Sequence, residues 1–135
     1  SIPVAIPGKG DAWFSGYGDK IQHNLTAKVD LNEEAVLSFD TWYRTETNAD
    51  MAFVEVSEDG INWTQAAQPL TGSSIDWKKE KLTIPAGTSH IRFRYQTDST
   101  VNGRGWYVDN VKLIFSDGQK VTPSFSGNGW KKRNY

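Results

Sequence analysis

The sequence predicts an all-β fold in which two antiparallel sheets pack face to face, as a β-sandwich or jelly roll. Apolar and polar residues alternate in several short runs, and turn residues separate these runs at intervals of about eight to twelve residues. In the segment 50–64, Ala52, Val54 and Val56 occupy every second position, and Asp59-Gly60 then forms a hairpin turn pair. No window shows the apolar period of a helix.

The first part of the chain contains an extended edge and two further strands. Residues 1–18 carry prolines, glycines and the aromatic pair Trp13-Phe14, which is typical of an extended segment followed by a loop. Residues 24–31 alternate apolar and polar side chains, so they form a half-buried strand. Residues 35–43 form the next strand, and a polar, acidic connection at 45–50 leads into the hairpin strand.

Three strands follow the hairpin, at residues 77–84, 89–97 and 106–115. The second is the most regular, because Ile91, Phe93 and Tyr95 share one phase and polar residues share the other. Polar loops that contain glycine separate the strands, at residues 65–74 and 98–105.

Length and composition indicate one domain over residues 1–135, with its core at about 11–115. The 135 residues are 37% hydrophobic and include six Trp and six Phe, which is enough for an aromatic core. Residues 119–135 are either a closing strand or the start of a following segment.

The charge balance and the lack of a long apolar run each exclude one class of partner. Fifteen basic and 16 acidic residues give a formal charge of −1, so no nucleic-acid footprint is present. No apolar run approaches the roughly 20 residues that span a bilayer, so membrane insertion is not expected. The absence of cysteine excludes disulfides, thiolate zinc sites and a cysteine nucleophile.

No catalytic residues are expected in this chain. The two histidines, His23 and His90, stand in neither a zinc-helix spacing nor a nucleophile-elbow turn. A glycosidase needs two carboxylates that face each other across a cleft, and the sequence shows no such pair.

The acidic residues at strand ends are candidates for a Ca²⁺ site. Asp109 shares a phase with Val111 and Leu113, so its charge needs a partner, which is a cation, an arginine such as Arg92 or Arg94, or backbone N–H groups. Calcium takes six to eight oxygen ligands, and loop-end carboxylates at one rim of a sandwich suit it. The alternative is that these acids are solvated or form salt bridges. The other candidates at strand ends are Glu46, Asp50, Asp98 and Asp19.

Aromatic side chains give a second hypothesis, because exposed Trp and Tyr rings stack on sugars. Trp13, Tyr17 and Trp42 are the ligand-binding candidates, together with Trp77 and Trp130. Trp42 is out of phase with Leu37 and Phe39, so we expect it to point outward. The alternative is that most of these rings belong to the core or cover sheet edges.

A series of short motifs resembles the β-sandwich region that follows the catalytic domain in immune inhibitor A-type secreted metallopeptidases. The resemblance covers about residues 11–115, and its pieces occur in the same order. They are Trp13-Phe14-Ser15-Gly16-Tyr17-Gly18-Asp19, Val29-Asp30-Leu31, Leu37-Ser38-Phe39-Asp40-Thr41-Trp42-Tyr43, Glu46 and Asp50, Val54-Glu55-Val56-Ser57-Glu58-Asp59-Gly60 with Trp63, Ile91-Arg92-Phe93-Arg94-Tyr95 with Thr97-Asp98, and Gly105 with Val108-Asp109-Asn110-Val111.

The resemblance implies a MAM-like or galactose-binding-like jelly roll that is exported from a bacterium and attached to a peptidase. Such domains frequently hold structural calcium, which strengthens the metal assignment of Glu46, Asp50, Asp98 and Asp109. The expected role is a non-catalytic accessory module, secreted or wall-associated, whose partners are an adjacent catalytic domain and a protein substrate or cell-surface glycan. The alternative is a carbohydrate-binding module that uses exposed Trp and Tyr.

Overall fold

Two antiparallel sheets make up the fold in the computed structural model, which describes residues 11–45, 50–98 and 105–134. Sheet A contains β1 (Asp11–Phe14), β3 (Ala35–Arg44), β6 (Lys78–Ile84), β8 (Gly105–Ile114), β9 (Lys120–Val121) and β11 (Lys131–Asn134). Sheet B contains β2 (Gln22–Lys28), β4 (Met51–Ser57), β5 (Thr64–Gln65), β7 (His90–Gln96) and β10 (Phe125–Asn128). The described residues include no helix, and therefore none long and apolar enough to cross a membrane.

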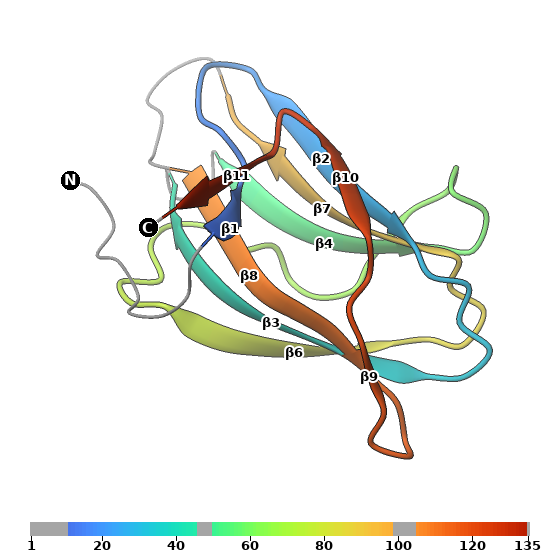
Figure 1. Ribbon diagram of the computed structural model, residues 1–135. Helices are drawn as coiled ribbons and strands as arrows, with labels where there is room; N and C mark the ends of the chain where they lie inside the picture. The colour runs from blue at the N-terminus through green and yellow to red at the C-terminus, as the bar shows by residue number, and fades with distance from the viewer. Residues whose placement is uncertain (1–10, 46–49, 99–104, 135) are drawn as a thin grey trace.

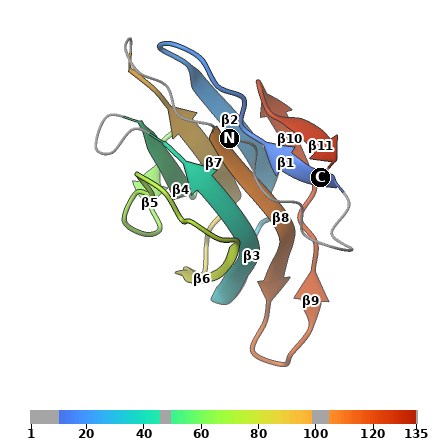
Figure 2. The same cartoon turned by 90° about the vertical axis from the view of Figure 1, so that its left-hand side faces the viewer.

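The strand order is that of a jelly roll. Sheet A runs β11-β1-β8-β3-β6 with β9 beside β8, and sheet B runs β10-β2-β7-β4-β5. The chain therefore crosses repeatedly between the sheets, which places β1, β8, β3 and β6 in one layer and β2, β7, β4 and β5 in the other (Figures 1 and 2). The predicted all-β sandwich is confirmed, and the ends of the main predicted strands lie within three residues of the observed ones.

The residues after 119 add a strand to the edge of each sheet. β10 pairs with β2, and β11 pairs with β1, so the C-terminal strands lie beside the N-terminal ones in both views (Figures 1 and 2). Trp130, in the turn between them, is only 4% exposed and belongs to the core. Its indole nitrogen donates a hydrogen bond to the His23 carbonyl oxygen at 3.1 Å.

Aromatic rings from both sheets fill the centre of the core. Phe93 of β7 contacts Phe39 and Trp106 edge to face, with ring centroids 5.2 and 5.4 Å apart. Trp106 also contacts Trp130 at 5.3 Å. The buried indole nitrogen of Trp106 donates a 2.7 Å hydrogen bond to the hydroxyl of Thr41, which itself donates to the Tyr107 carbonyl. Both polar groups are thereby satisfied inside an apolar core.

We expect Thr41→Val to lower the free energy of unfolding by about 1–3 kcal/mol, because the buried Trp106 nitrogen loses its acceptor. Chemical denaturation of the variant measures the loss. Thr83→Val is the matched control, since Thr83 is exposed on edge strand β6 and its hydroxyl can be replaced without burying an unsatisfied group. Equal stabilities for the two variants would contradict the role of the Thr41 hydroxyl.

A β-bulge in β8 corrects the predicted orientation of Asp109. Between Ser38 and Asp40 of β3 the register shifts by one, so β8 has an extra residue there, and Asn110 adopts φ = 51°. Val108 on one side of the bulge and Val111 on the other both face the core. Asp109 is buried, but it lies in the phase of Tyr107, whose side chain belongs to the cluster on the outer face of sheet A.

Candidate functional site

Two of the predicted metal ligands, Asp50 and Asp98, lie together at one end of the sandwich. Asp50 precedes β4 and Asp98 follows β7, and these strands pair with Met51 opposite Gln96. The backbone N–H of Asp98 donates to Oδ1 of Asp50 at 3.2 Å, and Asp50 is fully buried. The Asp98 carbonyl accepts from the N–H of Lys20, which brings Asp19 to the same end. We call Asp19, Asp50 and Asp98 the acidic rim.

The hydroxyl of Tyr95 lies under the acidic rim. Tyr95 is fully buried, and its hydroxyl has no hydrogen-bond partner within the described part of the chain. Burial raises the pKa of Tyr95 strongly, and the nearby charge of Asp50 raises it further. A buried hydroxyl that lacks a partner is unfavourable, so this end of the core offers an oxygen to a ligand or water.

The described acids do not complete a metal site by themselves. In residues 11–45, 50–98 and 105–134, no three His, Asp or Glu side chains form a group that could hold a metal ion. Glu46, the fourth predicted ligand, lies outside the described residues. A calcium ion at the acidic rim would therefore need Glu46, carbonyl oxygens or water beside Asp50 and Asp98.

Asp109 lies away from the acidic rim. It pairs with Asp40 of β3, four residues along β8 from Gly105, which corresponds to about 13 Å along the strand. Its Oδ1 accepts from the N–H of Asn110 at 2.8 Å, and its buried Oδ2 has no hydrogen-bond partner among the described residues. Lys79 and the Asn110 side chain both bond to Asp40 instead, each at 2.9 Å.

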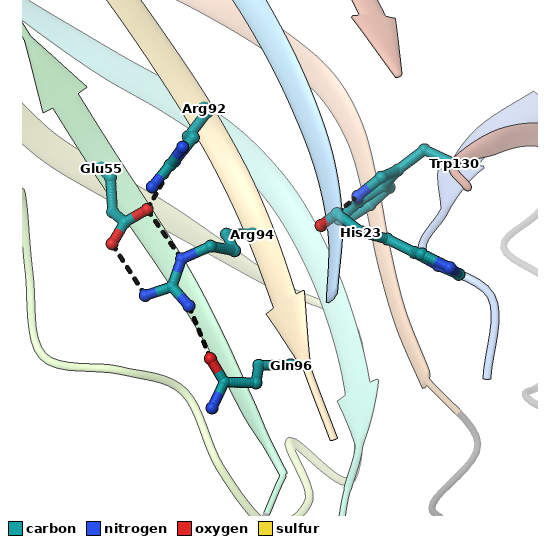
Figure 3. Close-up of polar contacts among 6 residues, drawn as sticks. All are labelled: His23, Glu55, Arg92, Arg94, Gln96 and Trp130. Carbon is teal, nitrogen blue, oxygen red and sulfur yellow. Dashed lines mark hydrogen bonds and ion pairs between the residues drawn. The ribbon is translucent and has the colours of Figure 1, made fainter. Parts of the chain in front are cut away.

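Arg92 and Arg94 pair with Glu55, so of the three kinds of partner considered for Asp109 the arginines do not serve, whereas a backbone N–H, that of Asn110, does. These arginines project from β7 onto the outer face of sheet B, where Glu55 of β4 lies between them (Figure 3). Nε of Arg92 donates to Oε1 of Glu55 at 2.7 Å. Arg94 binds both carboxylate oxygens at 3.0 Å and also donates to Gln96 at 2.7 Å.

Each guanidinium also stacks on an aromatic ring. Arg92 lies 4.1 Å from the centre of the Trp63 ring, and Arg94 lies 4.0 Å from that of Phe53. We call Trp63, Arg92, Glu55, Arg94 and Phe53 the guanidinium ladder. Burial raises the pKa of Glu55, but its hydrogen bonds to Arg94 and Arg92 and their charges outweigh that effect, so the pKa is lowered.

Trp42 points out of sheet A as predicted, but it is not exposed. Only 7% of its surface is accessible, and its indole nitrogen donates to the Ile75 carbonyl at 3.3 Å. Tyr107 packs against it edge to face at 5.9 Å. Trp42 therefore belongs to a covered aromatic cluster on the outer face of sheet A, and a sugar could not stack on it in this conformation.

The other two aromatic candidates differ in exposure. Trp13 is half-buried against the core, and the Lys132 ammonium lies 4.9 Å from its ring centre. Tyr17 is 65% exposed, and its nearest aromatic neighbour is Phe14 at 6.2 Å. Among the predicted sugar-binding residues Trp13, Tyr17 and Trp42, Tyr17 is the one whose ring is open to solvent.

Comparisons with known proteins agree with this architecture. The family model for the immune inhibitor A-like MAM domain matches residues 2–130. Bacillopeptidase F of Bacillus subtilis is 31% identical over 127 residues, which are 83% of this chain and 9% of that protein. The pre-pro-metalloprotease PrtV of Vibrio cholerae is 25% identical over 148 residues, covering 93% of this chain and 16% of that protein.

Among solved structures, the K1 cleaved adhesin domain of Lys-gingipain from Porphyromonas gingivalis W83 has the same fold. The TM-score is 0.54 at 17% identity, over 82% of this chain and 87% of the adhesin domain. The chain spans less than a fifth of the length of the curated relatives that it matches. Because the family model covers almost the whole chain, the protein belongs to the immune inhibitor A-like MAM domain family.

Proposed function

We propose that this chain is a non-catalytic accessory module of a secreted or cell-wall-associated bacterial peptidase, in which it packs beside a catalytic domain of the same polypeptide. The family match carries the proposal, because two of the relatives are named as a peptidase and a metalloprotease and are far longer than this chain. The proposed role is to bind a protein substrate or a cell surface, with loops at one end of the sandwich held by calcium.

The geometry of the histidines supports a non-catalytic role. Nδ1 of His23 bonds to the Ser15 carbonyl at 2.7 Å, which engages the ring in a structural contact. His90 contacts the hydroxyl of Ser89 at 2.7 Å, and that hydroxyl also donates to the Ser57 carbonyl. No carboxylate within the described ranges bonds to His90 to complete a triad.

We place the proposed calcium site at the acidic rim, with Asp50 and Asp98 of the rim and the predicted ligand Glu46 as its ligands. The burial of Asp50 and the unsatisfied Tyr95 hydroxyl support it, since buried oxygen atoms beside converging loops suit a hard cation. The loops are already joined there, because Thr97 donates to the Gly18 carbonyl at 2.7 Å. Calcium would neutralise the rim and fix these loops relative to each other. Asp109, the remaining predicted ligand, lies away from the acidic rim and is not part of this site.

Addition of calcium to protein treated with EDTA should raise the midpoint of thermal unfolding by about 10 °C at 100 times the dissociation constant, because the ion binds only the folded state. Thermal unfolding followed by tryptophan fluorescence measures the shift, with Mg²⁺ as the competing ion. Asp98→Asn and Asp50→Asn should remove most of the response.

The matched control is Asp117→Asn in the β8–β9 turn. Oδ1 of Asp117 accepts from the Gln119 N–H at 2.9 Å, and an asparagine oxygen can keep that bond. This variant should respond to calcium like the wild type. An unchanged midpoint of the wild type in EDTA and in calcium would refute the calcium site.

Carbohydrate binding is the second candidate function, and the open ring of Tyr17 favours it. A tyrosine ring with its face in water can stack on a sugar without any rearrangement of the core. Trp42 does not share this property, because its ring is covered.

A further inference from the structure

The outer face of sheet B contains an arginine with unused hydrogen-bonding capacity. Arg92 uses Nε for Glu55, while its two Nη groups have no hydrogen-bond partner in the described parts of the chain. Its side chain is nevertheless only 19% exposed, because Trp63 and Glu55 hold it from two sides. Arg92 is therefore a preorganised donor, and an anion would bind it without first ordering a flexible side chain.

The strands beside β7 carry amides and hydroxyls on this face of sheet B. Thr26 stands directly opposite Arg92 on β2, and Asn24 stands opposite Arg94. Oδ1 of Asn24 is buried and has no hydrogen-bond partner among the described residues. Amides and hydroxyls both donate and accept, as sugar hydroxyls do. The group consists of Asn24, Thr26, Gln65, Gln96, Ser126 and Asn128.

The charge of the guanidinium ladder is positive, because it contains two arginines and one glutamate. Glu55 balances one of these charges, so one positive charge remains on this face of sheet B. The free edge of the Arg92 guanidinium is suited to a bidentate contact with a carboxylate.

We propose that this face of sheet B binds a carboxylate-bearing polysaccharide, with Arg92 on the carboxylate and the amide and hydroxyl side chains on the sugar hydroxyls. The inference rests on the proposed binding role of the module and identifies the ligand class. Charge complementarity selects an acidic ligand, and the neighbouring amides select one rich in hydroxyls.

The test is a titration with short galacturonan oligomers, followed by tryptophan fluorescence and calorimetry. Trp63 stacks on Arg92, so it should report binding. We expect saturable binding that weakens at least tenfold for the neutral methyl-esterified oligomer, because the carboxylates are lost. Poly-L-glutamate of similar length should bind at least tenfold more weakly, since it has no hydroxyls.

Two variants locate the site. Arg92→Gln should weaken galacturonan binding at least tenfold, and Thr26→Glu should abolish it, because a carboxylate directly opposite Arg92 occupies the free guanidinium edge. Arg133→Gln, which removes the same charge from exposed strand β11 of sheet A, is the control and should bind normally. Thr26→Glu leaves the ladder intact, so it tests the site even if Arg92→Gln unfolds.

Three results would overturn the proposal: no galacturonan binding, equal binding of Arg92→Gln and Arg133→Gln, or poly-L-glutamate binding as tight as that of galacturonan. The last result would identify an acidic polypeptide as the ligand. The thermal response to calcium, measured on the same samples, is independent of this face. A protein that responds to calcium but binds no galacturonan would therefore refute this site and leave the acidic rim standing.

Discussion

Replacement of Glu55 by alanine should lower the free energy of unfolding by about 3–5 kcal/mol, because it leaves two partly buried arginines without their shared carboxylate. Glu55 is 5% exposed and holds Arg92 and Arg94 through three hydrogen bonds of 2.7–3.0 Å. Urea denaturation at neutral pH measures the loss. The unpaired guanidiniums would also loosen from Trp63 and Phe53, which exposes the outer face of sheet B.

The control for this prediction is Glu80→Ala on edge strand β6. Glu80 forms a surface ion pair with Lys78 at 3.5 Å, so its loss should change stability by less than about 1 kcal/mol. A loss for Glu55→Ala no larger than that of Glu80→Ala would show that the guanidinium ladder contributes little to stability.

The difference between wild type and Glu55→Ala should also depend on pH. The pKa of Glu55 in the folded protein lies below the ordinary value of 4.5, so its contribution is complete above pH 4.5 and decreases as the pH falls through the folded pKa. Urea denaturation between pH 7 and pH 3 should therefore bring the two proteins closer together in acid. A constant difference over this range would contradict the charged pairing.

Period-two alternation predicted most of the strands because both sheets have one covered face. Ile91, Phe93 and Tyr95 are fully buried, whereas Arg92 and Arg94 between them face outward. The same rule failed at Asp109, where one inserted residue changes the phase. The sequence signal for this bulge is weak. Asn110 adopts a left-handed backbone conformation, which asparagine tolerates but does not require.

Exposure and charge pairing could not be predicted, because both depend on contacts between distant parts of the chain. Trp42 has the predicted direction, yet residues from the connection before β6 cover it, including Ile75 with its carbonyl. Glu55 and its arginines are 37 and 39 residues apart, and only the register of β4 against β7 brings them together. The sequence did carry a signal for this pairing. Glu55 lies in the outward phase of one strand, and Arg92 and Arg94 lie in the outward phase of another.

The acidic rim was predicted only in part. Strand ends that meet at one rim explain why Asp50 and Asp98 are neighbours. Asp109 was grouped with them by its apparent inward phase, which the bulge invalidates, and its position in the middle of β8 keeps it apart.

Replacement of Gly129 by alanine should be the most damaging small substitution in the C-terminal strands. Gly129 has φ = 88°, which costs other residues about 1–2 kcal/mol. An added Cβ would also overlap the His23 ring, closer than the 3.0 Å that real Cβ contacts respect. The ring cannot move freely, because Nδ1 bonds to the Ser15 carbonyl at 2.7 Å. We expect a total loss of about 2–5 kcal/mol in urea denaturation.

Gly118→Ala separates backbone strain from the contact with His23. Gly118 has φ = 89°, and no atom lies within 4 Å of an added Cβ. Its loss measures the backbone strain alone, and the excess in Gly129→Ala measures the contact with His23. In a His23→Ala background, Gly129→Ala should therefore cost no more than Gly118→Ala does, as a double-mutant cycle would show. Equal losses for both glycine variants in the wild-type background would mean that His23 yields, and that the turn before β11 does not depend on it.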